Sequence, residues 1–339
     1  MHRTHHFRAC AYEIFAGLAT RLSAASLLVP ITLLAGMSTA RADIYLSNGG
    51  RSTVYDYSLT GTLVSSRATG GNLNTLSLDG PGNLYVTDLG GGEVKFPAGQ
   101  PLSSASYTGM SISGTAGLFY GSAVDSGGNV YFTTDADSSI SSDIKVYKYT
   151  GGAGSPALFS DTLANTSFSV YNTVAVDPIT GNVFVADNHN SDILEYGPTG
   201  GTTPIQTFTT GVSSPWDIAV DKLGDLYVSD GNGNVEKINI GTGTPTPVAT
   251  GLSSLKGLAV DSQNNLYYIA LDASSHGGIY EVTAAGSALG ELFNTGSLEA
   301  DYIALPVPEP AGATAVISII VLLLVAPRYL RSANSTRSA

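Results

Sequence analysis

Five copies of one short pattern run through the chain, and an internal repeat restricts the fold more than any other feature of a sequence. Each copy joins an apolar triplet, an aspartate, a turn rich in Gly and Asn, and a second apolar strand. The aspartates are Asp79, Asp125, Asp177, Asp221 and Asp261, spaced 46, 52, 44 and 40 residues apart. A period of about 40 to 50 residues with β-branched and aromatic strands is typical of propeller blades.

Two more strands complete each copy. A third follows the second, as in Ile193-Leu194-Glu195-Tyr196, and the fourth is clearest at residues 247–250. With first and second strands such as Ile218-Ala219-Val220-Asp221 and Gly224-Asp225-Leu226-Tyr227-Val228, this unit resembles the NHL-repeat propellers, whose blades run as IAVD, GNLYVAD and IxxF. The resemblance covers most of residues 43–305. It implies an all-β domain of four-stranded antiparallel blades.

The two ends of this region supply a sixth blade. Residues 43–47 look like a second strand that lacks its first, and residues 54–57 look like a third. The missing innermost strand is present at the far end as Tyr302-Ile303-Ala304-Leu305. We therefore predict six blades, closed into a ring by pairing of the last strand with the first, which removes an open sheet edge. The spacing of 52 residues leaves room for extra strands but not for a further blade.

Residues 1–42 have the features of an export signal. Three arginines accompany an uncharged apolar run at residues 22–37, and Ala40-Arg41-Ala42 has the small-x-small form that signal peptidase accepts. Cleavage there makes Asp43 the first residue of the mature protein. The alternative interpretation of this segment is a buried helix or an uncleaved anchor. The single cysteine, Cys10, precedes the apolar run, which argues against a lipoprotein signal and leaves the mature protein without a thiol.

Residues 306–339 carry the most specific motif. Pro308-Glu309-Pro310 is followed by an uncharged apolar run at residues 311–326 and a tail at residues 327–339 that contains three arginines. This order resembles the PEP-CTERM sorting signal, although the run is short for a membrane span and the tail is long and sparsely basic. The resemblance implies an inner-membrane helix and cleavage by an exosortase-type enzyme, followed by release to the cell surface or the extracellular polysaccharide matrix. An uncleaved anchor is the alternative.

The charge of the central region disfavours nucleic acid as a partner. Residues 43–310 contain 26 acidic and 8 basic side chains, a net charge of −18. Without a basic patch there is nothing to displace the counterions of a phosphate backbone.

The repeat aspartates invite a functional interpretation but have a structural one. Each begins a Gly-bearing hairpin turn, where an Asp side chain accepts hydrogen bonds from nearby backbone amides. We therefore expect them to stabilise turns and not to form a catalytic ring.

Ligand binding in propellers concentrates where the loops before the innermost strands converge on the central channel. Counting five places back from each repeat aspartate, and aligning the sixth blade, gives one candidate per blade, to which the neighbouring Asp217 is added. These candidate residues are Asn74, Tyr120, Asn172, Trp216, Asp217, Lys256 and Asp301. Aromatic, amide and charged groups of this kind suit a sugar or peptide, although ordinary loop packing would also explain them.

Enzymatic activity has less support. His189 and His276 are the only histidines of the mature segment, too few for a three-histidine metal site. A lactonase-like set could use Asn172, Asp217 and Asp301, but lacks the Glu of that family. Calcium is the only cofactor left open, at the loops 187–192 and 230–234, whose Asp and Asn residues also suit tight turns. We expect an exported binding or scaffold module with no catalytic residues and no cofactor, and keep a metal-dependent lactonase-like or lyase-like hydrolase as the alternative.

Overall fold

The computed structural model describes residues 43–48, 52–88, 92–105, 108–111, 119–137, 141–152, 156–164, 173–271, 276–296 and 300–305. The predicted signal peptide, sorting motif and membrane span all lie outside these residues. By contacts the chain divides into two units, Met1–Arg41 and Ala42–Ala339, and everything described belongs to the second. No helix within the described ranges has the length and apolar character needed to cross a membrane.

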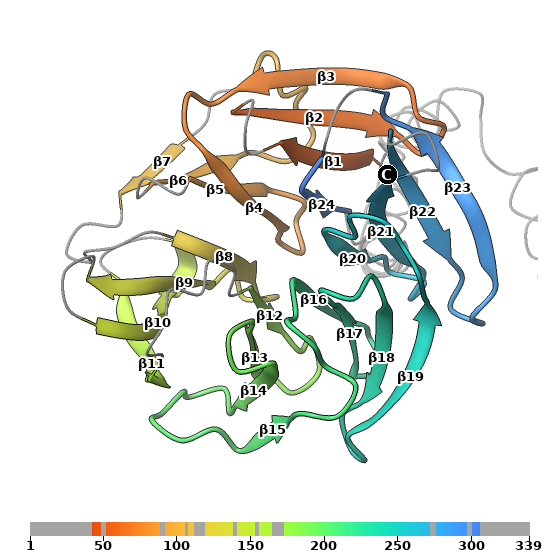
Figure 1. Ribbon diagram of the computed structural model, residues 1–339. Helices are drawn as coiled ribbons and strands as arrows, with labels where there is room; N and C mark the ends of the chain where they lie inside the picture. The colour runs from red at the N-terminus through yellow and green to blue at the C-terminus, as the bar shows by residue number, and fades with distance from the viewer. Residues whose placement is uncertain are drawn as a thin grey trace, which may run out of the picture. The chain divides into compact units, whose positions relative to one another are not determined.

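The described residues form six four-stranded antiparallel sheets (Figure 1). Blade one contains, from the innermost strand outward, β24 (Tyr302–Ala304), β1 (Asp43–Asn48), β2 (Thr53–Ser58) and β3 (Leu63–Ala68). Blade two contains β4 (Leu73–Leu78), β5 (Leu84–Asp88), β6 (Gly92–Phe96) and β7 (Thr108–Ser111). Blade three contains β8 (Phe119–Val124), β9 (Val130–Asp137), β10 (Ser141–Tyr149) and β11 (Ala157–Ala164). A 3-10 turn, η2 (Thr150–Gly152), follows β10.

The other three blades have the same order. Blade four contains β12 (Val174–Val176), β13 (Val183–Asp187), β14 (Asp192–Tyr196) and β15 (Gln206–Phe208). Blade five contains β16 (Asp217–Val220), β17 (Asp225–Ser229), β18 (Val235–Asn239) and β19 (Thr244–Ala249). Blade six contains β20 (Leu258–Val260), β21 (Leu266–Leu271), β22 (Gly277–Val282) and β23 (Ala288–Asn294). Innermost strands contact one another around the ring, from β4 through β8, β12, β16 and β20 to β24 and back to β4. The prediction of a six-bladed propeller is confirmed.

Closure of the ring follows the prediction as well. β24 pairs antiparallel with β1, with Tyr302 opposite Ser47 and Ala304 opposite Tyr45. One blade thus combines strands from the two ends of the described chain, which Figure 1 shows as a blue strand beside red and orange ones. The interface between first and last strands therefore holds the ring together.

The core is divided among the junctions between blades. Because side chains alternate along a strand, each blade has two apolar faces, and each face packs against a neighbouring blade. In blade five, Leu226 and Val228 pack toward blade four, whereas Tyr227 packs toward blade six. Apolar clusters of this kind lie at all six junctions of the described residues.

The outer strands depart most from the sequence pattern. We predicted a fourth strand at residues 247–250, whereas β19 covers Thr244–Ala249 and includes Pro245 and Pro247. Proline lacks a donor N–H, but an edge strand needs hydrogen bonds on only one side, so this position tolerates it. The long spacing between the second and third repeats reflects strands of eight and nine residues in blade three.

Candidate functional site

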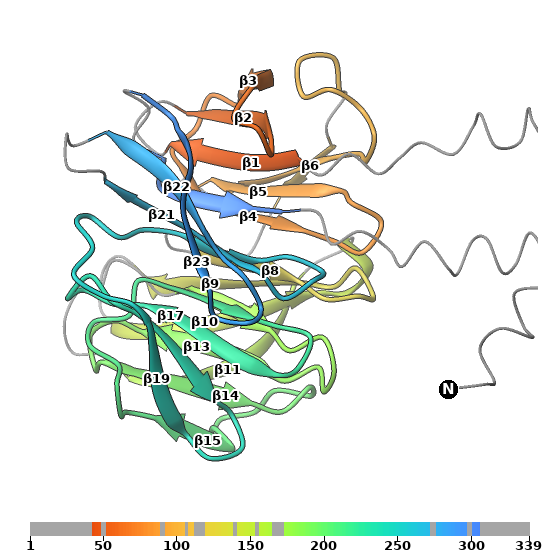
Figure 2. The same ribbon diagram turned by 90° about the vertical axis from the view of Figure 1, so that its right-hand side faces the viewer.

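The propeller has two faces, seen at the sides of the view in Figure 2. The face where the loops enter the innermost strands is here called the mouth face. The opposite face carries the hairpins between first and second strands, with their repeat aspartates, and is called the turn face. Trp216 and Asp301 directly precede β16 and β24, and Lys256 lies two residues before β20, so all three lie on the mouth face.

Three predicted candidates meet there. The Lys256 ammonium lies 4.2 Å from the centroid of the Trp216 ring, within the range of a cation–π interaction. The same nitrogen is 3.7 Å from the Asp301 carboxylate, and both charged side chains are about three-tenths exposed. Three neighbouring blades thereby bring an aromatic ring, a cation and an anion together at a partly open surface.

Backbone hydrogen bonds hold each of these residues in position. The N–H groups of Trp216, Lys256 and Asp301 donate to Ser229, Ile269 and Ser47, which lie in the second strand of the respective blade, at 2.8, 2.9 and 2.8 Å. The three side chains therefore project from a rigid frame. A preorganised site of this kind loses less conformational entropy when it binds a ligand.

Gly257 permits the close approach of the last two blades. Its N–H donates to the Asp301 carbonyl at 3.0 Å. A Cβ at this position would lie 2.9 Å from both that oxygen and the Tyr302 Cα, closer than backbone atoms allow. The glycine thus sets the distance between Lys256 and Asp301.

Of the remaining described candidates, Asn74 and Asp217 connect blades and Tyr120 is buried. The Asn74 amide donates to the Phe119 carbonyl at 2.7 Å, and its oxygen accepts from the Tyr302 hydroxyl at 3.0 Å. Tyr120 is buried in β8. Asn172 lies outside the described residues. Asn74 thus bridges three blades, a role that the pattern of residues did not reveal.

Asp217 serves a similar connection next to Trp216. One of its carboxylate oxygens accepts from the Leu258 N–H of the next blade at 2.8 Å, and the other accepts from the Ile218 N–H at 2.9 Å. Burial raises the pKa of Asp217 from its ordinary value of 3.8 to about 7, although these two backbone donors oppose the shift. A carboxyl group with a pKa near neutral pH can donate or accept a proton under physiological conditions, which makes Asp217 a candidate acid or base.

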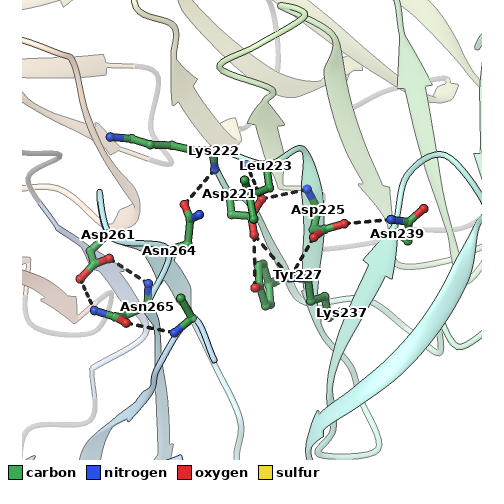
Figure 3. A network of polar contacts seen from close by, with 11 residues as sticks. Asp221, Lys222, Leu223, Asp225, Tyr227, Lys237, Asn239, Asp261, Asn264 and Asn265 are labelled. Carbon is green, nitrogen blue, oxygen red and sulfur yellow. Dashed lines mark hydrogen bonds and ion pairs between the residues drawn. The ribbon is translucent and has the colours of Figure 1, made fainter. Parts of the chain in front are cut away.

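The repeat aspartates stabilise turns, as predicted. Asp221 accepts from the N–H groups of Leu223 and Asp225 at 2.8 and 2.9 Å, and the Tyr227 hydroxyl donates to its second oxygen at 3.3 Å (Figure 3). Lys237 lies over the Tyr227 ring at 5.2 Å and forms an ion pair with Asp225 at 2.8 Å. Three further blades repeat the hydrogen bonds from a backbone N–H and a tyrosine hydroxyl, around Asp79, Asp125 and Asp261.

Blade four shows why the arrangement is structural. Phe184 replaces the tyrosine there and has no hydroxyl to donate. The Thr180 hydroxyl donates to the Asp177 carboxylate instead. A buried carboxylate needs hydrogen-bond donors, so in this turn a threonine hydroxyl takes the place of the tyrosine hydroxyl.

The two loops considered for calcium use their aspartates internally. One oxygen of Asp187 accepts from the N–H groups of His189 and Asn190, both at 3.0 Å. Asp230 accepts in the same way from Asn232 and Asn234 at 3.0 and 2.7 Å. Within the described part of the chain, no group of three or more His, Cys, Asp or Glu side chains has the spacing of a metal site.

One buried acid was missed at the sequence level. Glu93 in β6 is 1% exposed, and neither carboxylate oxygen has a hydrogen-bond partner. Burial raises its pKa from 4.5 to about 8, and the charge of Lys95 counteracts only part of this rise. The alternation Glu93, Val94, Lys95 predicts which face of the strand Glu93 occupies. It does not predict how deeply the neighbouring blade covers that face.

Comparisons with known proteins agree with this fold. The NHL repeat family model matches residues 213–234, which include Trp216 and Asp217. A protein chain in a nidogen/laminin complex is 15% identical, with a TM-score of 0.59, and the alignment covers 79% of this chain and 100% of that one. Comparison with curated proteins gives no match.

Two similar structures are enzymes. A streptogramin B lyase is 15% identical over 77% of this chain and 83% of its own, with a TM-score of 0.56. A gluconolactonase from Xanthomonas campestris is 16% identical over 67% of this chain and 79% of its own, with a TM-score of 0.53. At such identities the similarity defines the fold only: a six-bladed β-propeller, a class that includes enzymes and binding proteins.

Proposed function

We infer that this propeller is a ligand-binding module whose recognition surface consists of Trp216, Lys256 and Asp301. Their contact across three blades, at a partly exposed surface, supports this proposal. An indole ring offers a flat apolar surface, an ammonium donates hydrogen bonds, and a carboxylate accepts them. Carbohydrates present apolar ring faces and hydroxyl groups together, so a polysaccharide is the ligand we would test first, and a protein segment the second.

Export completes the proposal. The signal-like residues 1–42 and the resemblance of residues 306–339 to a PEP-CTERM signal support passage across the inner membrane, anchoring, and exosortase-type processing near Pro308. The domain would then act at the cell surface or in the extracellular matrix. Mass spectrometry of the native protein tests this step: a mature C-terminus near Pro308 is expected, and an intact residue 339 would contradict cleavage.

Trp216 offers a direct test of binding because it is the only tryptophan in the chain. We expect its fluorescence to change in a saturable way when soluble polysaccharides or their oligosaccharides are titrated into the protein. Removing a hydrogen bond to a charged group costs about 1.5–3 kcal/mol, so Lys256→Ala and Asp301→Ala should each weaken binding by roughly ten- to a hundredfold.

The matched control is Lys222→Ala, which removes a lysine from the turn face and should leave the affinity unchanged. Thermal unfolding of all variants verifies that the fold is intact. An identical titration curve for the wild type and Lys256→Ala would exclude this surface as the binding site.

A metal-dependent hydrolase of the lactonase or lyase type is the second candidate. The pKa of Asp217, about 7, and its place beside Trp216 favour it, because an acid or base that titrates near neutrality is useful in hydrolysis. Metal analysis distinguishes the two functions. A stoichiometric divalent ion that is lost on Asp217→Asn would favour the enzyme, and metal-free protein that still binds the polysaccharide would favour the binding module.

A further inference from the structure

The described chain begins and ends on the turn face. β24 starts beside β20, because the Gly257 N–H donates to the Asp301 carbonyl at 3.0 Å. Both strands run in the same direction, so Leu305 lies at the level of the Asp261 hairpin. The antiparallel pairing of β24 with β1 places Asp43 at that level also. The described chain therefore ends at Leu305 on the turn face, opposite the Trp216 surface.

The proposed membrane span follows after a short connection. Residues 306–310 separate Leu305 from the apolar run at 311–326, and three of these five residues are proline. Even a fully extended chain covers at most about 3.6 Å per residue, so the connection reaches roughly 20 Å. Strands of five or six residues are themselves about 17–20 Å long. To bring the mouth face to the membrane, the connection would have to run from the turn face to the mouth face along the length of a strand. That distance would use its whole reach.

The turn face also exposes side chains that suit a lipid surface. Ile179 and Leu223 occupy equivalent turn positions in adjacent blades and are 62% and 71% exposed. Ile179 extends toward the neighbouring turn, since a Cβ on Gly224 would lie 3.9 Å from its Cδ1. Lys222 is exposed beside Leu223, and its side chain points away from the Asp221 network in Figure 3. Exposed apolar side chains of this kind can enter the headgroup region of a membrane, and a neighbouring lysine can pair with anionic headgroups.

We propose that the anchored protein rests with its turn face on the lipid headgroups, through Ile179, Lys222 and Leu223, and holds the Trp216 surface away from the membrane. This orientation depends on the proposed C-terminal anchor. It leaves Trp216, Lys256 and Asp301 accessible to large extracellular ligands while the chain is still attached.

Matched single-cysteine labels in one blade test the orientation. In the mature chain, residues 43–339, which contains no cysteine, Ile179→Cys carries a fluorophore on the turn face and His189→Cys carries one on the exposed loop of the mouth face. Both proteins are reconstituted into vesicles of phosphatidylethanolamine and phosphatidylglycerol that contain a lipid with a nitroxide headgroup. We expect quenching at position 179 to be several times that at position 189.

Flotation of the vesicles separates this inference from the proposed anchoring. A chain that floats with the vesicles and shows equal quenching at both positions, or more at 189, overturns the orientation while the anchor stands. A chain that does not float contradicts the anchor, and the orientation with it. The role of the exposed side chains has its own readout: Leu223→Ser with Lys222→Glu should lower quenching at position 179, and unchanged quenching would remove these two residues from the contact.

Discussion

Glu93 is an acidic side chain enclosed by the junction of the second and third blades. Its strand neighbour Thr87 is equally buried, and the Thr87 hydroxyl also lacks a hydrogen-bond partner. The charge of Glu93 in turn raises the pKa of Tyr149 in the next blade, although burial contributes more to that shift. A group of this kind carries its proton in the folded state at neutral pH, because desolvation penalises the ionised form.

The protonation of Glu93 predicts a pH dependence of stability. The folded-state pKa, about 8, exceeds the ordinary value of 4.5, so folding binds a proton between these pH values. The contribution of Glu93 is therefore fully present below pH 4.5 and is lost as the pH rises through 8. We expect the free energy of unfolding to fall by a few kcal/mol over this range, and Glu93→Gln to reduce that fall.

Denaturant unfolding at pH 5 and pH 8 measures this effect. Asp217 contributes with the same sign up to its pKa of about 7, so a smaller decline should persist in Glu93→Gln. Equal declines in the wild type and the variant would mean that Glu93 is ionised in the folded protein.

Among the elements, β20 and β24 approach each other closely on the mouth face. Gly257 contacts the backbone of the closing strand, and a side chain there would have to displace main-chain atoms. The junction of the second and third blades instead includes a side-chain contact between the hydroxyl groups of Thr75 and Ser122 at 2.9 Å. Because main-chain atoms yield less readily than side chains, we expect the β20–β24 contact to tolerate substitution poorly.

Gly257→Ala should therefore destabilise the protein by about 1–3 kcal/mol, as overpacking does in other cores. It should also weaken ligand binding, since the distance between Lys256 and Asp301 depends on this contact. Gly197→Ala is the matched control, because a Cβ there meets nothing within 4 Å. Similar melting temperatures for the two variants would show that the ring expands without cost.

For the whole molecule, β24 determines whether the sheets form a ring. It covers the edge of β1, and Ile303 packs with Ile44 and Leu46 in the apolar cluster between the last and first blades. Without it, β1 has an unpaired edge and two junctions lose their innermost strand. Closed rings unfold cooperatively because each blade depends on both of its neighbours.

Two truncations test the closure. A chain that ends after Leu305 retains every described strand and should unfold in one transition. A chain that ends after Ala300 lacks β24 and should lose several kcal/mol, enough to abolish a cooperative transition in a domain of ordinary stability. Calorimetry compares them, and matching transitions would show that the open ring is sufficient.

The repeat period, the six blades, the closing strand and the turn aspartates were all predictable from sequence, because strand alternation and turn chemistry are local and recur with each blade. Tertiary structure decided which candidates meet. Trp216, Lys256 and Asp301 are up to 85 residues apart, and only the radius of the ring and the absence of a Cβ at Gly257 bring them into contact. The same holds for Asn74, which was predicted to face ligand but bonds two other blades, and for Glu93, whose burial depends on a neighbouring blade. Distances between blades arise from the packing of whole sheets, which no local pattern encodes.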